Sequence, residues 1–142
     1  MKSEILVWDK KYETGVYTID YEHQVFLSHI NNLQWAIENN APEKELEQIA
    51  ENIGRYAKFH FTSEEYFMKK INYPGLDAQK KLHNELLDNF QSSYSLSDDY
   101  TVFLNFLKDW FIEHTVLTDH KIGEYMKHKN IDIRDYTYSI FR

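Results

Sequence analysis

Apolar side chains recur every three to four positions along most of the chain, which is the spacing of one face of a helix. This pattern predicts helices over residues 20–38, 43–70, 76–93 and 98–128. Asp20 is placed to cap the first helix, and Pro42 suits the first turn of the second. Residues 1–18 lack the period and predict an extended arm, while the tail at 129–142 fits either a strand-like arm or a packed coil.

Short loops between the predicted helices favour an all-α fold, an antiparallel up-down-up-down four-helix bundle. A chain of 142 residues is long enough to bury one sizeable core, and we expect a single domain over 1–142. Four glycines and two prolines leave little turn material for a many-stranded β fold.

Histidines occupy unexpected positions, because His23, His60, His83 and His114 each fall on the apolar stripe of a different predicted helix. One such residue is as well explained by a hydrogen-bonded core histidine as by a ligand. Four in one core are harder to explain, since each unpaired buried polar group costs about 1–3 kcal/mol. A shared metal ion removes that cost, and bundle cores hold such sites between facing helices.

Carboxylates join these histidines. Glu64 follows His60 by one turn on the same stripe. Asp119 follows His114 by five residues, about 140° around an α-helix, from where it can reach in from the side. Two bridging carboxylates and more than four ligands exceed one tetrahedral zinc and favour a two-metal centre. We expect the remaining candidates at the surface or behind the ligands: His29, His120, His128 and Glu65.

Composition narrows the alternatives. The chain has no cysteine, which excludes disulfides, zinc–thiolate sites and iron–sulfur clusters. A net charge of −7 without a dense Lys/Arg block argues against a nucleic-acid partner. No stretch approaches the ~20 apolar residues of a membrane span, and the start lacks the apolar core of a signal peptide. We therefore expect a cytoplasmic protein without a membrane partner.

The ordered motifs resemble those of hemerythrins, most closely the single-domain bacterial kind. The resemblance rests on Trp8, "IDYEH" (19–23), "HFTSEE" (60–65), "YP" (73–74) followed by His83, and "WFIEHTVLTD" (110–119). It implies a four-helix bundle with two non-haem iron ions, bridged by carboxylates and an oxo or hydroxo group, which bind O2 reversibly.

The resemblance also implies roles for single residues. His23 and His60 would hold one iron, which keeps an open position for O2, and the second iron would take His83 and His114. Glu64 and Asp119 would bridge the two ions. Aromatic side chains would surround the O2 site and exclude water, and the candidates are Trp8, Phe26, Phe59, Phe106 and Trp110.

The chain departs from the hemerythrin pattern at Gln79, one turn before His83, where the family has a further histidine. Thr115 also replaces the usual isoleucine after His114. Three alternatives follow for Gln79. It does not bind the second iron, its amide oxygen binds the iron weakly, or a water molecule takes the coordination position that the histidine would fill. In each case the second iron is held less firmly.

The leading hypothesis is reversible O2 binding for storage, delivery or sensing. An alternative is a di-iron enzyme with peroxidase- or NO/O2-reductase-like activity, because the second iron would have an accessible position. A third is a bundle with a structural or mononuclear metal.

Overall fold

The computed structural model describes residues 4–96 and 99–132. Within these ranges the regular structure is helical throughout: η1 Lys10–Tyr12, α1 Tyr17–Glu38, α2 Glu43–Lys70, α3 Leu76–Leu96, α4 Tyr100–Ile112, the π-helical segment η2 Glu113–Asp119, and α5 His120–His128. Most of the C-terminal tail, residues 133–142, lies outside the described residues, so the expectation for its conformation stays a prediction.

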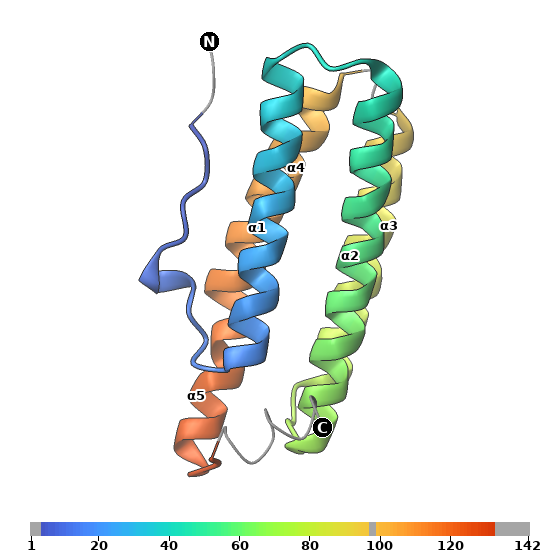
Figure 1. Ribbon diagram of the computed structural model, residues 1–142. Coiled ribbons are helices and arrows are strands. Elements are labelled where there is room, and N and C mark those ends of the chain that lie inside the picture. Colours follow the sequence, from blue (N-terminus) through green and yellow to red (C-terminus); the bar gives the residue numbers. More distant parts are fainter. Residues whose placement is uncertain (1–3, 97–98, 133–142) are drawn as a thin grey trace.

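The helices form the expected antiparallel four-helix bundle. Helix α1 packs against α2 and α4, and α3 packs against the same two helices, so the bundle closes. Figure 1 shows α1 and α2 side by side, with α4 behind α1 and α3 behind α2. No helix among the described residues is both long enough and apolar enough to cross a membrane.

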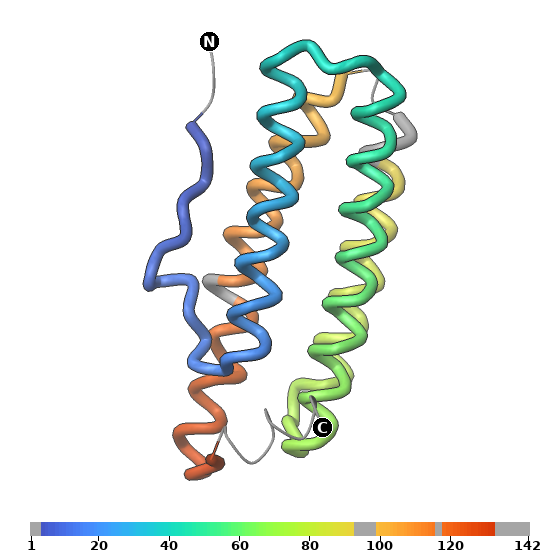
Figure 2. The backbone as a smooth tube through the Cα atoms, viewed as in Figure 1, coloured from blue at the N-terminus to red at the C-terminus, as the bar shows by residue number. Residues whose placement is uncertain are grey.

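The N-terminal arm runs along the outside of the bundle, beside α1 and the fourth helix (Figures 1 and 2). Long-range hydrogen bonds hold it there: Asn31 Nδ2 donates to the Leu6 carbonyl at 2.8 Å, and Lys108 Nζ donates to the Glu4 carbonyl at 2.8 Å. Tyr12, at the end of η1, is 5% exposed. The arm therefore covers part of the bundle core.

Helix α1 begins three residues before its expected start, and Asp20 is not its N-cap. Val16 occupies the N-cap position without a side-chain hydrogen bond, and Asp20 lies in the first turn. The Asp20 carboxylate instead accepts hydrogen bonds from the Thr14 N–H and hydroxyl, both at 2.8 Å, and from the Gly15 N–H at 3.1 Å. The arm folds back to supply these donors, which fixes the entry into α1.

The fourth helix starts at Tyr100 rather than near residue 98, after Asp99, whose carboxylate accepts from the Thr101 N–H at 2.9 Å. It then continues to His128, as the apolar period predicts, but not as one regular α-helix. The segment η2 winds as a π-helix between α4 and α5. Such segments insert extra length into a helix and occur often at functional sites.

Two apolar clusters fill the bundle and leave a layer between them. The larger cluster contains Phe26, Leu27, Ile30, Leu33, Ala50, Ile53, Ala57, Phe61, Phe103, Leu104, Leu107, Trp110 and Phe111. The smaller cluster contains Val16, Ile19, Phe67, Met68, Ile71, Ile122 and Met126. Each helix that contributes to both clusters crosses the layer between them, and the polar residues of the next subsection lie there.

Candidate metal centre

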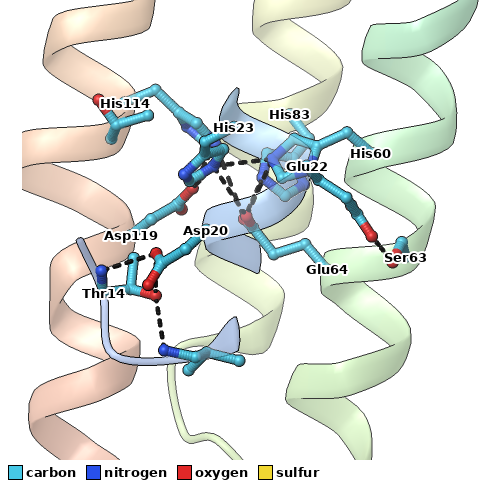
Figure 3. A network of polar contacts seen from close by, with 12 residues as sticks. Thr14, Asp20, Glu22, His23, His60, Ser63, Glu64, His83, His114 and Asp119 are labelled. Carbon is cyan, nitrogen blue, oxygen red and sulfur yellow. Dashed lines mark hydrogen bonds and ion pairs between the residues drawn. The ribbon is translucent and has the colours of Figure 1, made fainter. Parts of the chain in front are cut away.

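Buried imidazoles and carboxylates from different helices meet in the layer between the clusters. His23, on α1, lies between Ile19 and Phe26 of the two clusters, and is 1% exposed. His60 and Glu64, on α2, are both fully buried. One ligand atom from each of five residues lies within 4.8 Å of all the others: His23, His60, Glu64, His114 and Asp119. Figure 3 shows these side chains converging, with His83 beside them.

Glu64 divides its two oxygens between two pairs of histidines. Oε2 lies 3.1 Å from His60 Nε2 and 3.8 Å from His23 Nε2. Oε1 lies 3.1 Å from His83 Nε2 and 3.8 Å from His114 Nε2. A carboxylate placed in this way can bridge two cations, each bound by one histidine pair.

Asp119 joins the same two pairs from the other side. Its Oδ2 lies 2.9 Å from His23 Nε2 and 2.8 Å from His114 Nε2. The expected offset of about 140° from His114 is wrong, because it assumes an α-helix. The π-helical η2 makes i→i+5 hydrogen bonds, which bring residues five apart together on one face.

Further carboxylates orient the imidazoles from behind. His60 Nδ1 lies 2.8 Å from Glu22 Oε1, and Ser63 Oγ donates to Glu22 Oε2 at 2.7 Å. His83 Nδ1 lies 2.7 Å from Glu65 Oε2. These contacts place the Nδ1 proton outward and leave Nε2 facing the layer, as in metal sites whose histidines are backed by carboxylates.

The electrostatics of the layer favour cations. Burial, and then the facing His60, hold the pKa of His23 well below its ordinary value, so His23 offers a lone pair. Burial opposes charge on His60 too, but the Glu64 and Glu22 carboxylates outweigh it and raise the His60 pKa to about 10. Burial likewise opposes ionisation of Glu64 and Asp119, yet contacts with the histidines hold both pKa values below the ordinary range. Two buried carboxylates therefore stay ionised.

The donor set fits metal ions better than it fits a closed network of hydrogen bonds. Among the described residues, His114 Nε2, both carboxylate oxygens of Asp119 and Gln79 Oε1 are buried and make no hydrogen bond. Buried polar atoms normally have a hydrogen-bond partner, so each of these atoms needs a partner that the protein itself does not supply. Imidazole nitrogens with carboxylate oxygens suit iron or zinc, and two histidine pairs sharing two carboxylates suit two ions.

Gln79 lies on α3 one turn before His83, with 5% of its surface exposed. Residues at this spacing share one helix face, so both belong to the side that packs into the bundle. Its buried amide oxygen has no hydrogen-bond partner in the described part of the chain. The Thr115 hydroxyl, in contrast, is satisfied by the Phe111 carbonyl at 2.6 Å.

Aromatic rings surround the layer, but not all of those expected. Trp110 stacks on His114 at 5.2 Å, and Phe26 packs on Trp110 at 4.8 Å. Trp8 and Phe106 are half-buried against the larger cluster, farther out. Phe59 is 58% exposed and points outward, so its assignment to the pocket is wrong.

Three residues next to the ligands were not predicted from the sequence: Phe61, Phe111 and Glu22. Phe61 stacks on His83 with ring centroids 4.1 Å apart, and Phe111 lies 6.3 Å from His23. Phe61 falls four residues after Ala57 and three before Glu64, so its place on the stripe was readable. The sequence pattern does not indicate the contact of Glu22 with His60, because this contact depends on how α1 packs against α2.

The remaining titratable candidates lie away from the layer. His120 and His128 are exposed, and His120 Nδ1 lies 3.2 Å from the Glu13 carbonyl of the arm. His29 is half-buried on α1, with its ring 5.2 Å from that of Tyr56.

The sequence of this chain is similar to those of known proteins. The family description "Hemerythrin HHE cation binding domain" matches residues 14–125. Myohemerythrin of Riftia pachyptila is 30% identical over 115 residues, covering 81% of this chain and 88% of that protein. Bacteriohemerythrin of Clostridium acetobutylicum is 25% identical over 126 residues, covering 82% of this chain and 98% of that protein. The matched region contains every residue of the layer, and this chain belongs to the hemerythrin family.

Proposed function

We propose that this protein binds O2 reversibly at a centre of two non-haem iron ions, as a carrier, a store or a sensor. The observation that supports this most directly is the division of Glu64 between the pairs His23–His60 and His83–His114. His23 and His60 would hold one ion, and His83 and His114 the other. Glu64 and Asp119 would bridge them, and the bound iron would supply the electrons that O2 binding needs.

The surroundings of the centre favour binding without turnover. Phe61, Trp110 and Phe111 pack directly against the ligand rings, so little water reaches them. The relatives are named as hemerythrins, myohemerythrins and bacteriohemerythrins, and they give no support to the alternative of a di-iron enzyme. A cytoplasmic location stays a prediction from composition.

Gln79 takes the role of a weak ligand in this proposal. Its buried amide oxygen faces no hydrogen-bond donor in the described residues, and a metal ion beside His83 would satisfy it. A neutral amide binds more weakly than an imidazole, so the ion held by His83 and His114 should be the first to leave.

Cycling the iron-loaded, reduced protein between air and argon tests the proposal. We expect a visible absorbance change that appears with O2 and disappears with argon over repeated cycles. The variant His60→Ala should lose the change, and the variant at exposed His128, His128→Ala, should keep it. An absorbance change that never reverses would support the enzyme, and no change in the wild type would support a structural or mononuclear metal.

A further inference from the structure

The N-terminal arm is attached to the fourth helix on both sides of the π-helical segment η2. Before η2, Lys108 on α4 donates from Nζ to the Glu4 carbonyl at 2.8 Å. After η2, the Thr14 carbonyl packs against Gly123 on α5, where a Cβ atom would collide with it. Between these two points, η1 packs directly on η2 (Figure 1). The arm therefore contacts the fourth helix before, along and after its π-helical segment.

Tyr12 is the side chain through which the arm reaches the start of η2. Its ring is 5% exposed and meets the Phe111 ring edge-on, with centroids 5.7 Å apart. Phe111 is the next-to-last residue of α4, and its ring lies 6.3 Å from that of His23. Trp8 packs on Tyr12 from within the arm, at 5.4 Å. One aromatic ring thus separates the arm from a histidine of the candidate metal centre.

The two residues after Tyr12 contact the other end of η2. His120 is the first residue of α5, and its Nδ1 lies 3.2 Å from the Glu13 carbonyl. Thr14 donates to the Asp20 carboxylate from its N–H and from its hydroxyl, both at 2.8 Å. Because Asp20 lies on α1, this clamp fixes the arm against a second helix. Residues 12–14 therefore connect both ends of η2 to the rest of the bundle.

The form of η2 decides where Asp119 points. In a regular α-helix Asp119 would lie about 140° around the axis from His114. In the structure Asp119 is fully buried, and its Oδ2 lies 2.8 Å from His114 Nε2 and 2.9 Å from His23 Nε2. π-helical turns are rare, so contacts from outside the helix have to favour one here. The arm supplies such contacts at both ends of η2.

We propose that the N-terminal arm is a positioning element of the metal centre: residues 12–14 hold η2 in its π-helical form and thereby keep Asp119 between the two histidine pairs. This inference deepens the proposed function and rests on its metal centre. No residue of the arm binds metal in this account, because the arm acts through Asp119. Release of the arm should therefore weaken metal binding although every ligand is still present.

Competition titrations of the full chain with Zn²⁺ and a chelator test this role. Gly123→Ala displaces the Thr14 carbonyl, and Tyr12→Ala removes the ring that packs before η2. Each should lower the zinc affinity about 10–100-fold, the usual effect of losing a residue that orients a ligand. Val7→Ala, on the outer side of the arm and 74% exposed, should change nothing. Leu33→Ala, in the larger cluster on α1, controls for lost stability and should also leave the affinity unchanged.

Deletion of Thr118 distinguishes control of η2 from a general effect of the arm. The deletion leaves His114 and Asp119 four residues apart, so they share a face in a regular α-helix and no π-helical turn is needed. Combined with Gly123→Ala or with Tyr12→Ala, it should restore the zinc affinity to within a few-fold of the wild type. Unchanged affinity in both single variants, a loss that the deletion does not restore, or an equal loss in Leu33→Ala would overturn the proposal.

Asp20→Asn releases the arm more gently and keeps the test decisive if the other two variants do not fold. It weakens the hydrogen bonds from Thr14 and Gly15 and leaves the residues that contact η2 in place. We expect a smaller loss of zinc affinity, again restored by deletion of Thr118, and no loss would overturn the proposal. Zn²⁺ has no redox activity, so these titrations do not depend on O2. Failure of the iron-loaded wild type to bind O2 would remove the proposed function and leave the role of the arm standing.

Discussion

His114 Nε2 lies 2.8 Å from Asp119 Oδ2, although the two residues are five positions apart in the chain. The π-helical segment η2 makes this contact possible, because its i→i+5 hydrogen bonds place such residues on one face. Asp119 then reaches His23 as well, at 2.9 Å, and joins α1 to the fourth helix. The extra residue in the helix thereby aims a carboxylate at both histidine pairs.

Changing the length of η2 should separate the geometry of the helix from the identity of its residues. Deletion of Thr118 leaves His114 and Asp119 four apart, which share a face in a regular α-helix, so we expect metal content to be retained. Insertion of one alanine after Thr118 turns Asp119 by a further ~100° in an α-helix. Metal analysis of the loaded variants should show a loss only for the insertion, and equal losses in both would contradict the role of η2.

Glu22 should control metal affinity without binding metal. It holds His60 Nδ1 at 2.8 Å, and partners behind metal-binding histidines are worth about 10–100-fold in affinity. We expect Glu22→Gln to lower the affinity within that range in a competition titration against a chelator. The control is Glu51→Gln, on the exposed part of α2, which should have no effect. An unchanged affinity in Glu22→Gln would show that His60 needs no orientation from α1.

The fold was readable from the sequence because the helical period is carried by apolar burial, which the bundle preserves. The meeting of His23, His60, His83 and His114 followed in the same way, since residues on the stripes of a bundle point into one core. The orientation of Asp119 toward the histidines could not be predicted from the helical period. A period of 3.6 cannot reveal where tertiary packing favours a π-helical turn.

The sequence pattern also assigned some neighbouring residues to the wrong face of their helix. Phe59 and Phe61 flank His60, and successive residues on a helix point about 100° apart. Phe59 therefore faces solvent, whereas Phe61 packs against the metal centre. Glu22 stands next to His23, but it points toward α2 because of how the two helices pack. Such contacts depend on the relative placement of helices, which a single stripe does not encode.

Gly123 should be essential for the docking of the arm. A Cβ atom at this position would collide with the Thr14 carbonyl, which is backbone and cannot move as a flexible side chain can. We expect Gly123→Ala to lower the free energy of unfolding by about 1–3 kcal/mol, the usual cost of overpacking. Urea denaturation measures this, with Lys127→Ala on the same helix as the control. A wild-type midpoint in Gly123→Ala would mean that the arm does not dock here.

Stability should fall on mild acidification partly because of His29. Burial lowers the pKa of His29 below its ordinary value of 6.5, so the unfolded chain takes up this proton first as the pH falls. The contribution of His29 is fully present above pH 6.5 and is lost as the pH falls toward its folded pKa. Urea denaturation from about pH 8 to about pH 5 should therefore show a smaller loss for His29→Gln than for the wild type. His128→Gln is the exposed control, and identical pH profiles in His29→Gln and wild type would refute the assignment.

We propose that two histidine pairs and two shared carboxylates hold two metal ions, and that Gln79 weakens the binding of the ion held by His83 and His114. An anaerobic titration of the metal-free chain with ferrous iron, followed by dialysis and metal analysis, tests this most directly. We predict binding that ends at two ions per chain, with one of them lost first on dialysis, and retention of both in Gln79→His. Binding that ends at one ion per chain in both wild type and Gln79→His would contradict the account.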